Sequence, residues 1–363
     1  MWTLILVFFG VVAVAAGAYI VFRIHRFSFI RRLAEKNKVL AWILSALPVA
    51  ALAPFLLVNA YALVVALLHF FLGFVMCDLV AFIVRKVSKR SFDHDVQNVV
   101  AIVLTVVYLG AGWFFAHHVF STEYTFYTEK EIGADIRIVE IADLHLGITL
   151  DGEGFRQQTE RVQATNPDAV FIVGDFVDDD TEKDDMLAAC QALGSLKTKY
   201  GVYFVYGNHD EGYFTYRNFS SEDLRGALDE NGVTVLEDEN VLLDDRFYVI
   251  GRLDRSMPGR KEAKDLTAGL DDSKYVIILD HQPNDYAAEQ EAGADLVLSG
   301  HTHGGHIFPS GLVGLAIGAN DKVYGSEVRG NTTFVVTSGI SGWAIPFKTG
   351  CISEFVVIDI KSK

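Results

Sequence analysis

Four long apolar segments dominate the first third of the sequence. They cover residues 2–22, 39–58, 61–84 and 98–118. A helix needs about 20 largely apolar residues to cross a bilayer, and each segment is close to that length. The second and third segments would form one helix far longer than the bilayer is thick, so we expect the chain to fold back between Pro54 and Tyr61, where Asn59 and two prolines weaken the helix. The pattern predicts a transmembrane domain of four helices over residues 1–120.

The charges around these segments predict their orientation. A secretory signal peptide is an alternative for the first segment, but basic residues follow it rather than precede it, and no small-residue cleavage site is evident. Basic clusters begin at Arg23 and at Arg85, after the first and third segments. Loops rich in Lys and Arg face the cytoplasm. We therefore expect a multi-pass cell-membrane protein in which everything after residue 120 is extracytoplasmic.

Short apolar runs that alternate with polar, helix-compatible stretches replace this pattern in the rest of the chain. Strands are expected at 136–142, 169–173, 202–205, 247–251, 276–279 and 296–298, and helices at 155–166, 181–197, 220–231 and 284–292. A hairpin is expected at 243–246. Strands separated by helices predict a layered α/β core with ligands at the strand ends. We place this domain at residues 135–363, after a linker at 121–134.

The two parts of the chain differ sharply in charge. Residues 1–120 contain ten Lys and Arg and four Asp and Glu; of the totals of 31 and 46, this leaves 21 basic and 42 acidic residues for 121–363. A surface this acidic repels polyphosphate backbones, so we expect no nucleic-acid partner. The three cysteines provide no disulfide framework, although a pairing of Cys190 with Cys351 stays open.

Metal-binding residue types follow five of the predicted strands. The first pair is Asp143 and His145, and side chains two apart on an extended strand share one face, so both could bind one metal. The other clusters are Gly174-Asp175 with Asp178, Gly207-Asn208-His209-Asp210, His281, and Gly300-His301-Thr302-His303. Any one of these is a weak signal, because such residues are common in turns. Their recurrence at successive strand ends indicates a metal site.

The order of these motifs resembles the calcineurin-like metallophosphoesterase superfamily over about residues 135–360. The run from Gly300 to Gly305 and the tail at 337–346 resemble its membrane-associated bacterial branch, which includes relatives of the UDP-2,3-diacylglucosamine pyrophosphatases. His306 stands where that family usually has Gln. The resemblance implies a four-layer α-β-β-α sandwich, here preceded by the four-helix transmembrane domain.

The resemblance also implies a role for each site residue. Asp143, His145 and His303 would bind one metal ion, Asn208, His281 and His301 a second, and Asp175 would bridge the two. His209 would act on the leaving-group oxygen, and Asp210 would orient its imidazole. A hydroxide held between the metals would attack phosphorus in line. Mixed nitrogen and oxygen ligation favours two divalent ions such as Mn, Fe or Zn.

Three further features have two interpretations each. Asp178 either supports the site or caps a helix. Arg252, Arg255 and the nearby Arg260 either bind a second phosphate or lipid head group, or form salt bridges with neighbouring acids. The apolar residues from Phe308 to Ile317 form either a lip for an acyl chain or ordinary core.

Together these features predict a membrane-anchored phosphoesterase. We expect its partners to be the bilayer and a phosphorylated substrate, in which a phosphoester or pyrophosphate bond of a lipid-linked or envelope compound is hydrolysed. An anchored phosphodiesterase or phosphatase for soluble substrates is the alternative within the same chemistry. A non-catalytic metal-binding scaffold and a membrane sensor are alternatives of another class.

Overall fold

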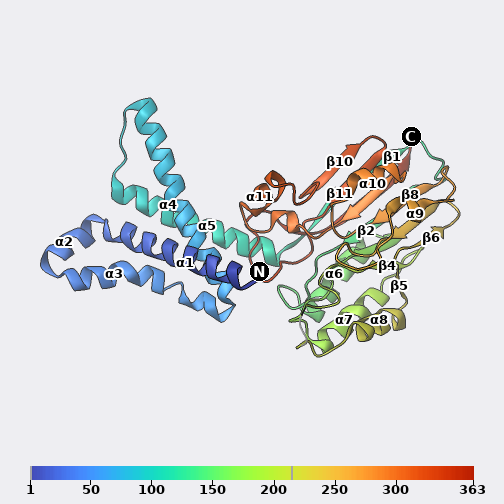
Figure 1. Cartoon of the computed structure of the whole chain (residues 1–363), viewed down its shortest axis with the longest axis horizontal. Helices are drawn as coiled ribbons and strands as arrows, with labels where there is room; N and C mark the ends of the chain where they lie inside the picture. Colours follow the sequence, from blue (N-terminus) through green and yellow to red (C-terminus); the bar gives the residue numbers. More distant parts are fainter. Residues whose placement is uncertain (1, 214–215) are drawn as a thin grey trace. The chain divides into compact units, whose positions relative to one another are not determined.

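The computed structural model describes residues 2–213 and 216–363 and divides into two compact units (Figure 1). The first unit comprises residues 1–111 and the second residues 112–363.

The first unit is helical. Its elements are α1 (Trp2–His25), α2 (Ser28–Lys36), α3 (Lys38–Ala50), the 3-10 turn η1 (Ala53–Leu57), α4 (Ala60–Ser88) and the greater part of α5 (His94–His117). Asn59 ends the expected turn, because its side chain accepts a hydrogen bond from Ala62 N (2.9 Å) and caps α4. The chain thus folds back at Asn59, as the sequence predicts.

Among the described residues, three segments are long and apolar enough to cross a membrane. They are Lys38–Leu57, Ala60–Ser88 and His94–His117. Gly10–His25 and Ser28–Lys36 meet at a bend of 81° and supply a fourth only if the pair forms one broken span. The first predicted span lies within α1, whose side chains are described only from Gly10 onward.

A partly buried ion pair joins the helices of this unit. Arg23 Nη1 lies 2.9 Å from Asp78 Oδ2, and its Nη2 donates to Asn98 Oδ1 (2.6 Å). Charged groups within apolar helices are costly unless paired, so these contacts link α1 to α4 and α5.

The second unit is a mixed α/β fold whose described residues form two six-stranded sheets. Its elements are β1 (Val119–Thr128), β2 (Ile136–Ile141), α6 (Gly152–Ala164), β3 (Ala169–Val173), α7 (Lys183–Gly194), β4 (Val202–Val205), α8 (Ser221–Glu230), β5 (Val233–Val235), β6 (Glu239–Leu243), β7 (Phe247–Gly251), α9 (Ala263–Thr267), β8 (Tyr275–Leu279), α10 (Tyr286–Glu291), β9 (Leu296–Ser299), η2 (His303–Gly305), α11 (Ser310–Ala316), β10 (Gly325–Arg329), β11 (Thr332–Val336) and β12 (Ser353–Ser362). The strand orders are β1-β12-β2-β3-β4-β5 and β10-β11-β9-β8-β7-β6. The expected hairpin is present, since β6 and β7 pair antiparallel around residues 244–246.

Three apolar cores hold this unit together. One contains side chains of both sheets, such as Ile138 and Val356 from the first sheet and Leu298 from the second. Another contains α6, α7 and α8, which Figure 1 shows grouped on one side of the strands, together with the first sheet. A third contains α9, α10 and the second sheet. Strands covered on both faces read as continuous apolar runs, which is why the sequence reveals them.

The expected linker at 121–134 is largely a strand instead. β1 pairs in parallel with β12 along its whole length, and its burial alternates residue by residue. Tyr124 and Phe126 pack against the core shared by the two sheets, while Thr125 between them and Glu123 before them are exposed. Because polar residues interrupt its apolar ones, the run lacks the continuous apolar signal of the inner strands.

Parallel strands bring the metal-binding motifs together. β2, β3 and β4 are neighbours with the same direction in the first sheet, and β8 and β9 are parallel neighbours in the second. Parallel neighbours end on the same side of a sheet, so the segments that follow these strands meet at one edge of each sheet.

Candidate metal centre

The expected ligands do not extend the strands that precede them. β2 ends at Ile141, and both Asp143 and His145 have positive φ (53° and 39°). The sequence led us to expect both side chains on one face of an extended strand, and this expectation is wrong. Their position comes from a tight turn held by bonds from Asp143 N to Gly174 O and from His145 N to Asp175 O, both 3.0 Å. Left-handed backbone at non-glycine residues is costly and concentrates at functional sites.

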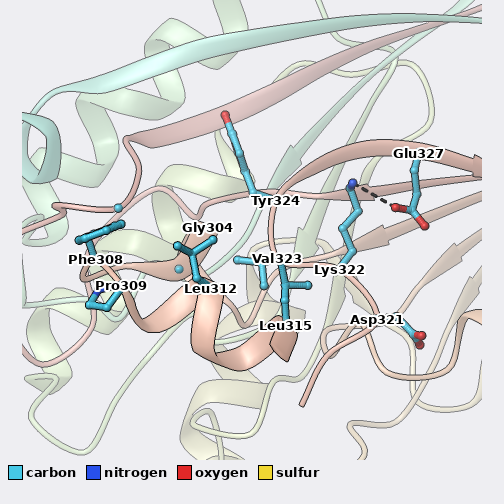
Figure 2. Close-up of a pocket in the computed structure, with 13 residues that line it drawn as sticks. Gly304, Phe308, Pro309, Leu312, Leu315, Asp321, Lys322, Val323, Tyr324 and Glu327 are labelled. Atoms are coloured by element: carbon cyan, nitrogen blue, oxygen red, sulfur yellow. Dashed lines mark hydrogen bonds and ion pairs between the residues drawn. The ribbon is translucent and has the colours of Figure 1, made fainter. Parts of the chain in front are cut away.

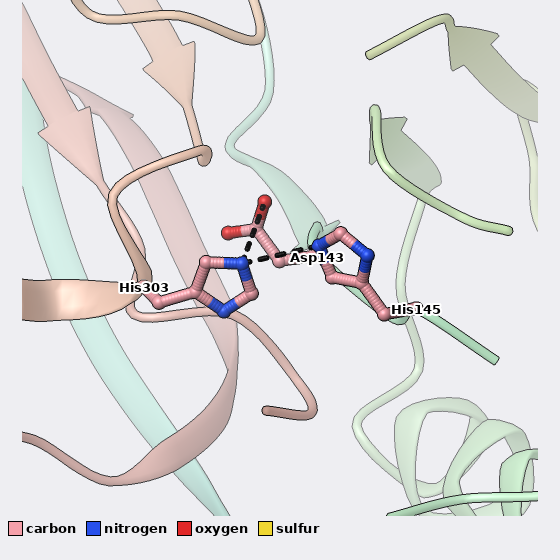
Figure 3. A group of neighbouring side chains, drawn as sticks. All are labelled: Asp143, His145 and His303. Atoms are coloured by element: carbon pink, nitrogen blue, oxygen red, sulfur yellow. Dashed lines mark hydrogen bonds and ion pairs between the residues drawn. The ribbon is translucent and has the colours of Figure 1, made fainter. Parts of the chain in front are cut away.

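One group of potential ligands contains Asp143, His145 and His303 (Figure 3). The carboxylate and both imidazole rings point toward one another. His145 Nε2 and His303 Nε2 are 3.1 Å apart, and His303 Nε2 is 4.0 Å from Asp143 Oδ1. Two nitrogens bound to one metal at about 2.0–2.1 Å lie roughly 3.0–3.4 Å apart, so this spacing fits a shared metal ion.

A second group contains Asp175, His281 and His301. His281 Nδ1 faces Val173 O at 2.9 Å, and this contact directs Nε2 to within 3.1 Å of Asp175 Oδ2. A second ring nitrogen anchored on a carbonyl is usual for metal-binding histidines.

Two buried oxygens further support ligation. Asp143 Oδ2 and Asn208 Oδ1 have no hydrogen-bond partner among the described residues. The amide nitrogen of Asn208 donates to Tyr213 Oη (2.8 Å), so the oxygen is left for another contact. Buried polar atoms are rarely left unpaired, and a cation satisfies both oxygens. The residues present therefore fit a bound metal.

Asp175 lies between the two groups. Its Oδ2 is 3.5 Å from His145 Nε2 in one group and 3.1 Å from His281 Nε2 in the other. The approach requires glycine at position 207, where a Cβ atom would lie 2.2 Å from Asp175 Oδ1. Burial alone would raise the pKa of this carboxyl, but His281 and His145 hold it well below its usual value.

Asp178 is the residue that connects two imidazoles. Its Oδ2 lies 2.9 Å from His145 Nδ1 and its Oδ1 lies 3.0 Å from His209 Nδ1. α7 begins only at Lys183, with Glu182 in the capping position, so the helix-capping interpretation of Asp178 does not describe the structure. Burial favours the neutral acid, yet its bonds to the two imidazoles lower the pKa of Asp178 below its usual value.

Asp210 does not orient His209, contrary to the sequence-based expectation. Its buried carboxylate accepts hydrogen bonds from four backbone N–H groups, those of Asp175, Phe176, Val177 and Gly207, at 2.7–3.0 Å. It thereby joins the turn after β3 to the turn after β4. The expectation came from its place beside His209 in the sequence, but neighbouring side chains in a turn can point in different directions.

We expect Asp210→Asn to destabilise the fold. An asparagine turns an N–H group toward the backbone donors and leaves at least one of them unpaired, at a cost of about 3 kcal/mol. The thermal unfolding midpoint of the full chain in detergent should fall, whereas the exposed neighbour Glu211→Gln should not change it. Equal midpoints for the two variants would show that the four bonds contribute little.

The sequence did not reveal two aromatic residues beside His209. The rings of Tyr213 and Trp343 lie 4.9 Å and 5.7 Å from its ring, centroid to centroid, and both side chains are exposed. No spacing pattern marks either residue, although Trp343 falls in the tail that carries the family resemblance. They frame His209 on its solvent side.

The surroundings of His301 and His209 set the protonation of their imidazoles. Burial lowers the pKa of His301 to about 4, with a further contribution from the nearby His281, so His301 is neutral and able to bind a metal. Burial also opposes the charge on His209, but the bond to Asp178 and the neighbouring Asp175 outweigh it and raise its pKa.

The arginine residues do not gather around the site. Arg252 is only 2% exposed, and it forms salt bridges with Asp280, Asp285 and Glu289. Arg260 pairs with the first two of these acids. Salt bridging therefore describes both residues, and the phosphate-binding interpretation of Arg252 is wrong. Arg255 is exposed and lines a polar pocket with Gln282 and Asn284.

An apolar pocket of about 440 Å³ adjoins the last metal-binding segment (Figure 2). Its wall includes Gly304 and Gly305 of η2, Phe308, and Leu312 and Leu315 of α11. The apolar segment from Phe308 to Ile317 therefore contributes part of the wall of a cavity. The ring of His306 is tilted by 38° relative to that of His303, with ring centroids 5.4 Å apart, and burial together with Lys348 lowers the pKa of His306 to about 3.

Known proteins resemble this chain in sequence. Residues 136–305 match the family model described as calcineurin-like phosphoesterase. An uncharacterized metallophosphoesterase of Helicobacter pylori is 30% identical over 320 residues, covering 81% of this chain and 83% of the relative. Another from Aquifex aeolicus is 31% identical over 248 residues, covering 66% and 91%.

A vertebrate relative extends the similarity to a membrane protein. It is the zebrafish "transmembrane protein with metallophosphoesterase domain", which is 30% identical over 298 residues, covering 76% of this chain and 65% of the relative. Its name and the apolar helices of the first unit point to membrane association. The chain belongs to the calcineurin-like metallophosphoesterases and is a metal-dependent phosphoesterase hydrolase.

Proposed function

We propose that the protein is a membrane-anchored phosphoesterase with two divalent ions in one site. The observation that carries this proposal is the position of Asp175 Oδ2, within 3.5 Å of a histidine nitrogen in each group of ligands. Paired divalent ions need a shared anionic ligand between them. Asp143, His145 and His303 would hold one ion, and Asn208, His281 and His301 the other, with Asp175 common to both.

The ions and His209 would have different roles in hydrolysis. Two divalent ions supply charge neutralisation at the phosphoryl oxygens and a water made acidic enough to act as a nucleophile near neutral pH. His209 keeps one proton on Nδ1 facing Asp178, so its Nε2 is free to give a second proton to the leaving oxygen. Tyr213 and Trp343 restrict the space around that nitrogen.

We propose an amphiphilic phosphate as the substrate, such as a lipid-linked or envelope phosphoester or pyrophosphate outside the cytoplasm. The apolar pocket supports this, because it shares Gly304 and Gly305 with the segment that carries His303. Arg252 and Arg260 do not support this substrate, because both are engaged in salt bridges. An extracytoplasmic site also argues against a cytosolic precursor such as a UDP-linked diacylglucosamine.

Hydrolysis by the full chain in detergent tests this proposal. We expect turnover of bis-p-nitrophenyl phosphate and faster turnover, at equal concentration, of a lipid phosphate presented in mixed micelles. A strong preference for soluble nucleotides over every lipid phosphate would contradict the amphiphilic substrate. Metal binding without turnover of any phosphoester would favour the scaffold alternative.

Removing the metal should abolish this activity. We expect a chelator to reduce hydrolysis to background, because His145, His281 and the carboxylates alone do not polarise a phosphoryl group. Adding back Mn²⁺, Fe²⁺ or Zn²⁺ singly, with metal analysis of the product, should restore activity at about two ions per chain. Restoration at one ion per chain would contradict the paired site.

We expect Asp178→Ala to weaken the site without removing a ligand. The change frees both His145 and His209 to rotate, and loss of such supporting contacts typically costs about 10–100-fold in metal affinity or activity. Steady-state hydrolysis and a metal titration measure the two effects. Asp180→Ala is the matched control, because Asp180 is an exposed carboxylate in the same turn. Equal activity of the two variants would contradict the role of Asp178.

A further inference from the structure

The segment that follows His303, residues 304–319, has apolar side chains that line the pocket and others that are exposed on the side away from it. Residues 304–319 contain no Asp, Glu, Lys or Arg, in a domain that is otherwise strongly acidic. Val313 is 53% exposed and Ile317 is 73% exposed, and neither lines the pocket. They are four residues apart at α11 and so lie on one face of it. An exposed apolar face of this kind marks a contact surface.

This face is joined to the end of a candidate membrane span. The last turns of α5 belong to the second unit, and Gly112 O accepts a hydrogen bond from Lys348 N (2.9 Å). Ala116 O accepts another from Ser353 Oγ (3.0 Å). The segment 348–353 thus rests on the final turns of the span.

The same segment holds the chain that leads into α11. Gly350 N donates to His306 O (2.9 Å), and Phe308 N donates to Thr349 Oγ1 (3.1 Å). α11 begins at Ser310, two residues after Phe308. Short hydrogen-bonded steps therefore connect the end of the span to the apolar helix.

Aromatic residues mark the level at which α5 leaves the bilayer. Trp113 is 51% exposed and Phe114 is 49% exposed, and their rings stack on His117 and His118. Amphipathic aromatic residues concentrate at the boundary between lipid and water. A boundary at these residues lies beside the segment that supports α11.

We propose that the outer face of α11, formed by Val313 and Ile317, docks into the lipid surface beside the span. The occupant is the bilayer itself, because this face carries no charge to desolvate, and the chain that leads into it is hydrogen-bonded to the segment that contacts the last turns of α5. Docking holds the segment with His301 and His303 at the membrane surface. The inference does not depend on which phosphate is hydrolysed.

Fluorescence quenching in the full-length, reconstituted protein tests the docking. Ile317→Cys is labelled with an environment-sensitive fluorophore in vesicles of phosphatidylcholine, with or without bromine on the acyl chains. Leu242→Cys is the control, an exposed leucine on β6, the strand at the opposite end of the second sheet from β10. The native chain treated identically gives the background from its three cysteines.

We expect brominated lipid to quench the Ile317 probe and dissolved iodide to leave it largely unaffected, with the reverse for the Leu242 probe. Quenching of both probes by iodide alone overturns the proposal. A probe at 317 shielded from iodide and from brominated lipid alike also overturns it, because protein then covers the face. Retained hydrolysis of bis-p-nitrophenyl phosphate shows that each labelled protein is folded.

Discussion

Asp175→Asn is expected to lose bound metal and to lower turnover by about 10³-fold or more. The substitution keeps the shape of the side chain but removes the negative charge that lies within 3.5 Å of a ligand in each group. Metals contribute several kcal/mol of charge stabilisation in the transition state, and about 1.4 kcal/mol corresponds to a factor of ten in rate. Metal content by mass spectrometry and hydrolysis of bis-p-nitrophenyl phosphate measure the two losses.

The matched control for this variant is Asp180→Asn, which removes a charge from an exposed carboxylate in the same turn. It should keep both metal and activity. A protein with Asp175→Asn that retains two ions per chain and most of its activity would show that the carboxylate is not shared. Loss of one ion with the other retained would assign Asp175 to a single group.

His209→Asn should lower turnover by about 10²–10⁴-fold while leaving the metal content unchanged. The amide nitrogen of asparagine occupies a place close to Nδ1 and can still donate to Asp178, but nothing replaces Nε2. The effect therefore isolates the nitrogen that faces away from Asp178. Because that nitrogen is expected to protonate the leaving oxygen, esters of poor leaving groups should lose more than p-nitrophenyl esters.

Hydrolysis of a p-nitrophenyl ester and of an alkyl ester shows whether His209 transfers a proton. Equal losses for a p-nitrophenyl ester and for an alkyl ester would show that His209 stabilises charge without transferring a proton. His209→Ala serves as the second variant, since it also removes the bond to Asp178. If the asparagine variant loses metal, the supposed division between binding and proton transfer is wrong.

The sequence predicts most of the second unit because its inner strands are covered on both faces. Val170 and Phe204, for example, lie in continuous apolar runs, and metal-binding residue types follow these runs directly. The expected helices at 155–166, 181–197, 220–231 and 284–292 correspond to α6, α7, α8 and α10 with ends displaced by a few residues. Strands that are buried on both faces can therefore be predicted from their continuous apolar sequence.

Contacts between side chains are harder to predict from the sequence. The link from Asp178 to both His145 and His209 depends on the direction of three side chains in turns, and the adjacent Asp210 was the more obvious partner by position. The backbone of Asp143 and His145 is left-handed, which no residue pattern indicated. β1 was missed because polar residues, such as the exposed Glu123 and Thr125, interrupt its apolar ones.

The junction of α5 and β1 limits where the enzyme can work. A single residue, His118, separates the end of the helix at His117 from the start of the strand at Val119. Flexible linkers let a tethered domain sweep a volume that grows with their length, and here that length is almost zero. The catalytic unit therefore lacks a flexible tether. For the amphiphilic substrate proposed above, we expect turnover to follow the number of substrate molecules per membrane area rather than their bulk concentration.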